Sequence, residues 1–262
     1  MHGALFVAKT GLTAQDTSLK VISHNLANAS TVGFKKDRVV FEDLLYQTVR
    51  QPGAETTAEG NQLPSGLQVG NGVRIVGTQK MFTTGEVQIT DETFDVAIDG
   101  RGFFQVQMPN GEIGYTRNGQ FHLTADGELV TAEGYLIEPA ITLPDDVQTF
   151  TVGVDGTVDV VVAGDPNPQQ IGTLEIADFV NPQGLQAIGQ NLFIETAASG
   201  APQVAAPGEE GLGIVRQGML EASNVNAVEE LVNMITTQRA YEINSKVIST
   251  ADEMLSFITQ QL

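Results

Sequence analysis

The stretch LFVAKTGLTAQDTSLKVISHNLANA, residues 5–29, places a leucine at every seventh position. These leucines are Leu5, Leu12, Leu19 and Leu26, and the apolar residues three positions after three of them are Ala8, Ile22 and Ala29. Gln15 fills the remaining slot. An a/d stripe over four heptads is typical of a coiled-coil seam. The stripe predicts a helix over about the first thirty residues, with Gly33 as the stop just past its end.

Residues 217–262 carry a second helical stripe. Its members recur every seven residues at Met234, Tyr241, Ile248 and Leu255, and the same face is extended by Ala227, Leu231, Ala251 and Ile258. No Gly or Pro occurs in residues 221–262, which is common in coiled coils and unusual for a globular helix. We expect Ser223 or Asn224 to cap the start of this helix.

The two stripes together predict the side chains that pack the helices. They are Leu5, Leu12, Leu19, Ile22, Leu26, Leu231, Met234, Tyr241, Ile248, Leu255 and Ile258. A buried leucine stabilises by about 1.5–3 kcal/mol only when something covers it, and one helix pair cannot cover both stripes on all sides. An intramolecular core is the ordinary interpretation of an apolar face. Length, strict heptads and terminal placement instead favour contacts between copies, which form a filament when they do not close a ring.

The middle of the chain has a different pattern. Over residues 90–193, short apolar runs alternate with turn signals such as Asn110-Gly111 and Asp155-Gly156, which predicts an antiparallel β-domain built of hairpins. Residues 47–72 are polar and Gly-rich, and they read as a long loop or extended arm. The expected class is α+β, with a helical domain (1–33 and 217–262), an arm or connector (34–88) and a β-rich domain (89–216).

Composition narrows the functional classes. The 262-residue chain has a net charge of −19, so binding to nucleic acid or anionic lipid is disfavoured. It contains no cysteine, which excludes disulfides and thiolate chemistry. No apolar run reaches eighteen residues, so no membrane-inserted helix is expected. The first twenty residues lack the basic start and apolar block of a cleavable secretory signal.

Motifs for catalysis are missing from the sequence. The three histidines, His2, His24 and His122, fall in different segments without metal-ligand spacing. Acidic pairs such as Asp126 and Glu128 lie at turns, where solvated carboxylates are ordinary. We therefore expect no catalytic residues, no cofactor and no metal, and we expect that the protein is not an enzyme.

Three long motifs resemble the flagellar axial protein family of rod and hook subunits. They are NLANASTVGFKKD (25–37), DVAIDGRGFFQVQMPNG (95–111) and SNVNAVEELVNMITTQRAYEINSKVISTADEM (223–254). Within this family the resemblance is closest to distal rod subunits, because residues 46–76 resemble their characteristic insertion. The resemblance implies that the terminal helices form an inner tube around an export channel, that the β-domain lies outside it, and that the tube transmits torque from motor to hook.

The same resemblance implies further properties. A rod-stiffening arm would include Gln51, Pro52, Gly53, Leu63, Pro64, Ser65 and Gly66. Implied partners are other copies of the chain, proximal rod proteins, the hook protein, the P-ring and L-ring, the rod cap and the flagellar type III export apparatus. The implied location is the basal body across the periplasm. The alternatives are a proximal rod subunit, a secreted β-domain carbohydrate hydrolase, and an adhesin or binding module.

Overall fold

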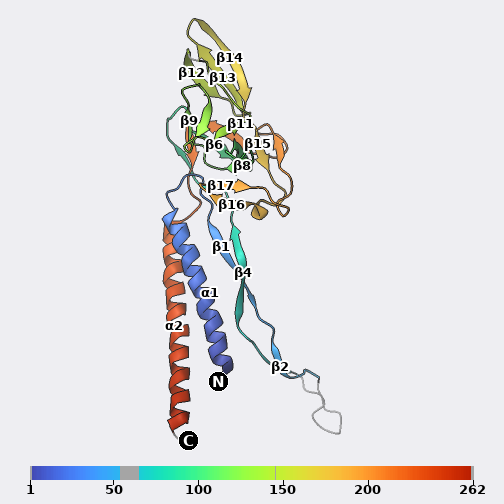
Figure 1. The fold of residues 1–262 in the computed structure, drawn as a ribbon, viewed down its shortest axis with the longest axis vertical. Helices are drawn as coiled ribbons and strands as arrows, with labels where there is room; N and C mark the ends of the chain where they lie inside the picture. Colours follow the sequence, from blue (N-terminus) through green and yellow to red (C-terminus); the bar gives the residue numbers. More distant parts are fainter. Residues whose placement is uncertain (1, 54–64, 145, 261–262) are drawn as a thin grey trace. The chain divides into compact units, whose positions relative to one another are not determined.

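The computed structural model describes residues 2–53, 65–144 and 146–260. The chain is divided into two compact units (Figure 1). The helical unit comprises Met1–Ala27, Asp37–Gln79 and Asn226–Leu262, and the β unit comprises Asn28–Lys36 and Lys80–Val225. The predicted α+β class is confirmed, since the terminal helices pair and the central residues form antiparallel sheets.

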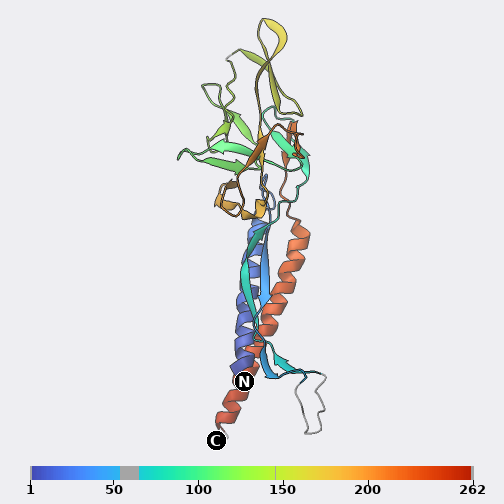
Figure 2. The same cartoon turned by 90° about the vertical axis from the view of Figure 1, so that its right-hand side faces the viewer.

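Two long helices dominate the helical unit. Helix α1 spans His2–Ala27 and α2 spans Ala227–Gln260, and they lie side by side in both views (Figures 1 and 2). The side chain of Asn226 caps α2, because its Oδ1 accepts hydrogen bonds from Val228 N at 3.0 Å and Glu229 N at 3.3 Å. The predicted caps were wrong. Asn224 is used elsewhere, with its amide bonded to Lys36 N and Met81 O.

Helix α1 ends earlier than the heptads predicted. It stops at Ala27, so Ala29 lies beyond it in a turn. Asn25 is 2 % exposed, and its amide donates to Asp37 O and accepts from Asp37 N, both at 2.9 Å. Gly33 is not the helix cap. It has φ +68°, and a Cβ there would lie 2.6 Å from the carbonyl carbon of Arg117, so only glycine fits.

A long β-hairpin, here called the arm, completes the helical unit. Strand β1 (Asp37–Asp43) pairs with β4 (Val73–Lys80), and β2 (Gln47–Arg50) pairs antiparallel with β3 (Leu67–Val69). Leu44 N donates to Gly72 O at 2.9 Å between the two strand pairs. Residues 47–72, which the sequence predicts to be a long loop or extended arm, are therefore partly paired as β-strands. Thr10 on α1 accepts a hydrogen bond from Val73 N at 3.3 Å, which fastens the arm to α1.

Antiparallel sheets form the β unit. The largest has nine strands, with β15 joining β7 to β18, and its strands are β16 (Gln186–Gly189), β17 (Leu192–Ile194), β8 (Ile113–Thr116), β7 (Phe103–Gln107), β11 (Leu136–Glu138), β10 (Leu129–Thr131), β9 (Phe121–Leu123), β15 (Ile176–Asp178) and β18 (Gln203–Ala205). Smaller sheets are formed by β12 (Val147–Val152), β13 (Thr157–Val162) and β14 (Asp165–Thr173), by β6 (Val96–Asp99) with β19 (Ile214–Gln217), and by β5 (Val87–Ile89) with β20 (Met219–Glu221). A 3-10 turn covers Pro182–Gly184.

The core of the β unit is apolar and aromatic. Phe104 and Phe121 are fully buried and meet edge to face at 5.1 Å. A second cluster gathers around Phe103, whose ring meets Phe179 at 6.0 Å. The β unit thus has a core of its own, whereas the helical unit depends on helix packing.

Candidate self-assembly surfaces

The predicted packing side chains form a seam that one copy covers only in part. On α1, Ala8 and Ile22 are buried, while the four leucines that are seven apart remain half-buried. On α2, Met234, Ile248 and Leu255 are half-buried, and Tyr241 and Leu231 are exposed. Ile258 lies in α2, but its side chain is outside the described residues. The role of these side chains in assembly stays a prediction.

Sequence reasoning missed a second apolar face of α2, here called the outer stripe. Its members are Val228, Val232, Ile235, Ile243, Val247, Met254 and Phe257, all exposed. At 3.6 residues per turn, Val232, Ile243 and Phe257 lie nearly opposite the seam positions Met234, Tyr241, Ile248 and Leu255. Ile235, Val247 and Met254 each lie about 100° from an adjacent seam position, on the flanks of the seam. Spacings of three, four and seven, as between Val228, Val232 and Ile235, were the signal in the sequence. Apolar faces of this length mark association sites on soluble proteins.

The outer stripe borders an apolar groove at the start of α1. This groove has a volume of about 420 Å³, and its lining includes Ala4 from α1 and Ile243, Val247 and Met254 from the outer stripe. Helix α2 continues past it to Gln260. The groove therefore offers an apolar surface of α1 and α2 to a side chain of another chain.

The tip of the arm is exposed along its described length. Every residue of β2 and β3 is exposed, including Val49, Leu67 and Val69. Gln51, Pro52, Gly53 and Ser65 are exposed, and Gly66 is half-buried. A Cβ on Gly66 would lie 2.6 Å from Arg50 O, so glycine permits the close approach of the two strands there. Leu63 and Pro64 lie outside the described residues.

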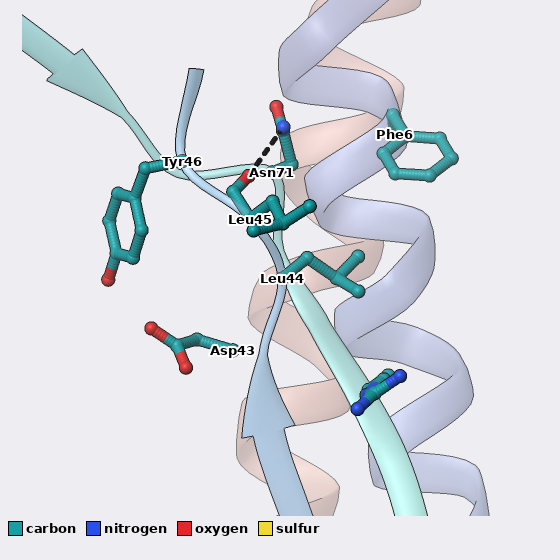
Figure 3. A pocket seen from close by; sticks show the side chains of 7 residues that line it. Phe6, Asp43, Leu44, Leu45, Tyr46 and Asn71 are labelled. Atoms are coloured by element: carbon teal, nitrogen blue, oxygen red, sulfur yellow. Dashed lines mark hydrogen bonds between the residues drawn. The ribbon is translucent and has the colours of Figure 1, made fainter. Parts of the chain in front are cut away.

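Where the arm passes α1 it forms a pocket of about 710 Å³, shown in Figure 3. Phe6 from α1 and Leu44, Leu45 and Tyr46 from the arm line it. Leu45 is 89 % exposed, although Asn71 Nδ2 fixes its backbone by donating to Leu45 O at 2.7 Å. A large apolar side chain exposed in this way on a hydrogen-bonded backbone is suited to contact another chain.

Tyr46 and Asp43 at this pocket also interact through their side chains. The carboxylate of Asp43 lies near the phenol of Tyr46, and its capacity to accept a hydrogen bond and its negative charge raise the pKa of Tyr46. Both side chains belong to the arm. Because its pKa is raised, the phenol of Tyr46 stays protonated at neutral pH.

The described part of the chain offers no cluster suited to metal binding. No three or more His, Cys, Asp or Glu side chains gather there in a way that fits an ion. His24 and His122 belong to different units, and the side chain of His2 is outside the described residues. Neither helix, over its described residues, has a stretch long and apolar enough to span a membrane.

Three family models match this chain. The flagella basal body rod protein model matches residues 5–35, the flagellar hook protein FlgE/F/G D1 domain model matches 97–160, and the flagellar basal body rod FlgEFG protein C-terminal model matches 216–261. The matched segments include most of α1, the centre of the β unit and all of α2.

Whole-chain relatives agree with these matches. The chain is 52 % identical to the flagellar basal-body rod protein FlgG of Buchnera aphidicola subsp. Acyrthosiphon pisum, over 99 % of this chain and 100 % of the relative. It is 48 % identical to FlgG of Caulobacter vibrioides (98 % of each chain) and 38 % identical to FlgG of Bacillus subtilis (97 % of each chain). The chain therefore belongs to the FlgG family of flagellar basal-body rod proteins.

Proposed function

We propose that this protein is a structural subunit of the distal rod, which assembles with other copies into a rigid helical tube. The observation that supports this most directly is the outer stripe. Its apolar side chains stay exposed in a single copy, even though α2 packs against α1. Covering them requires another chain, and a second copy presents the same complementary helices.

In the proposed tube the helices of neighbouring copies pack against one another. The outer stripe of one copy would lie against the half-buried leucines of the next, in a coiled-coil-like manner. Such a contact joins two different surfaces, so it repeats along a helix instead of closing a dimer. Residues 1–33 and 217–262 would line the tube, and residues 89–216 would lie outside it.

The arm is the proposed stiffening element. Its described tip residues, Gln51, Pro52, Gly53, Ser65 and Gly66, and its apolar residue Leu45 would contact adjacent copies. A hairpin that bridges copies adds contacts away from the tube axis, and such contacts resist bending more than axial ones do. Residues 34–88 would in this way make the assembly straight.

The proposed setting follows from the family. Its members are rod proteins of the flagellar basal body, which favours a structural role over a secreted hydrolase. The tube would transmit torque to the hook and enclose the export channel. Proposed partners are proximal rod proteins, the hook protein, the P-ring and L-ring, the rod cap and the type III export apparatus, with the rod crossing the periplasm.

Limited proteolysis of the monomer beside the polymer, with fragment masses and electron microscopy, tests the proposal. Helices gain most of their stability from packing, and in a monomer these helices are only partly covered. We therefore expect the protease to remove about the first 30 and last 45 residues of the monomer while the β unit survives. Polymers should be straight tubes in which both ends are protected. Failure to polymerise, or equal protection of the ends in monomer and polymer, would contradict it.

A further inference from the structure

A buried cluster of three charges lies in the β unit, formed by Lys35, Arg117 and Glu221. Their side chains are 0 %, 3 % and 1 % exposed. Glu221 Oε1 accepts hydrogen bonds from Lys35 Nζ at 2.6 Å and from Gly85 N at 2.7 Å, and Oε2 accepts one from Arg117 Nη1 at 3.3 Å. One carboxylate therefore holds two cations and a backbone amide that are distant in the sequence.

The cluster depends on the charge of Glu221. Burial lowers the pKa of both Lys35 and Arg117, and the carboxylate of Glu221 is the main group that raises them. Asp178 also faces Arg117, but it is engaged at 2.7 Å with Arg101. Without Glu221, two buried cations would face each other with no hydrogen-bonded counter-charge, a highly unfavourable arrangement.

The same residue fastens the N-terminal connector, defined here as Asn28–Lys36. Glu221 O accepts a hydrogen bond from Gly33 N at 2.8 Å. Lys35 Nζ also donates to Thr83 O at 2.7 Å, and Lys36 N donates to the side chain of Asn224 at 2.7 Å. Three segments separated by up to 186 positions thus meet around one carboxylate.

We infer that the Lys35–Glu221–Arg117 cluster is a clasp that holds the N-terminal connector in the β unit. The connector follows α1 in the sequence, and Glu221 comes shortly before α2. Loss of the carboxylate's charge would therefore release the connector, while the strands of the nine-stranded sheet would keep their own core. The clasp is a property of a single copy and does not depend on the proposed tube.

Hydrogen exchange of the full-length chain, resolved to the amides of Gly33 and Lys36, tests the clasp. Removing one partner of a buried ion pair is far more damaging than removing an exposed one, so Glu221→Gln should accelerate exchange at both amides by at least about a hundredfold. Amides of β10 (Leu129–Thr131) should stay protected. The control is Asp99→Asn, which breaks an exposed pair with Arg216 at 2.7 Å and should change exchange at Gly33 less than about threefold.

A second variant separates charge balance from simple packing. Lys35→Met in the wild-type chain should accelerate exchange at Gly33, because it removes two hydrogen bonds of the clasp. In the Glu221→Gln chain the same change should slow exchange, because it removes an unbalanced buried cation. The inference is overturned if Glu221→Gln leaves Gly33 and Lys36 protected, or if Lys35→Met has the same effect in both chains.

If Glu221→Gln also accelerates exchange at the amides of β10, the substitution unfolds more than the connector. The Lys35→Met variant then decides whether the clasp exists, since it leaves Glu221 and Arg117 as a neutral pair. Faster exchange at Gly33 with β10 protected supports the clasp. Unchanged exchange at Gly33 overturns it.

Discussion

Replacing Ile243 in the outer stripe with aspartate should prevent assembly without disturbing the monomer. Ile243 is 64 % exposed in a single copy. Full burial of an isoleucine contributes about 1.5–3 kcal/mol, so covering this exposed part contributes about 1–2 kcal/mol per copy. Ile243→Ala should therefore raise the critical concentration for polymerisation about five- to thirtyfold. Ile243→Asp also buries a carboxylate, which costs several kcal/mol, and the increase should exceed about a hundredfold.

The critical concentration can be measured by sedimenting polymer across a range of total protein. Val154→Asp is the matched control, because Val154 in the β unit is 63 % exposed and an aliphatic side chain is likewise replaced by aspartate. The free energy of unfolding of both variants should lie within about 0.5 kcal/mol of the wild-type value, as is usual for substitutions at exposed positions. If Ile243→Asp polymerised at the wild-type concentration, the outer stripe would not be a contact between copies and this reasoning would fail.

Three further predictions concern the arm and the connector. Deleting residues 47–64 should leave polymers that form but bend, visible by electron microscopy as curved filaments; straight filaments would exclude the stiffening role. Gly33→Ala should lower the free energy of unfolding by more than about 2 kcal/mol, because it combines an unfavourable positive φ with a backbone clash. Gly3→Ala, which meets nothing within 4 Å, is its control in the same denaturant titration. Asp43→Asn should bring the pKa of Tyr46 down toward its ordinary value of 10.0. Tyrosinate absorbance should then appear at a lower pH than in the wild type. An unchanged titration would show that the carboxylate of Asp43 does not raise this pKa.

The heptad pattern was sufficient to predict both helices and their pairing, because helix periodicity is a local property of the sequence. The outer stripe is equally visible in the sequence, since Val228, Val232 and Ile235 have helical spacing, but the seven-residue repeat does not include these positions. The end of α1 was not readable. The side chain of Asn25 bonds to Asp37, and that contact depends on how the chain turns after the helix.

Contacts between residues that are far apart in the chain are harder to predict from a single sequence than helices are. The arm pairs residues around Thr48 with residues around Gln68, and Gly-rich polar sequence gives no register for that pairing. Lys35 and Glu221 are ordinary charged residues in the sequence, and only the folded chain makes them partners. Non-local charge pairs are invisible to periodicity, so a buried cluster of this kind appears only in the structure.

The proposed polymerisation must overcome repulsion between copies that each carry a net charge of −19, so the distribution of that charge along the chain matters. The helical unit has seven basic and eleven acidic residues, whereas the β unit has six basic and 21 acidic residues. Like-charge repulsion between exposed groups falls off over about 8 Å at physiological ionic strength, so it matters most where surfaces touch. The outer stripe, the seam and the arm all belong to the less acidic unit. In the proposed tube, contacts through that unit would bring copies together with much less repulsion than contacts through the β unit, and the acidic β unit would favour the solubility of the assembly.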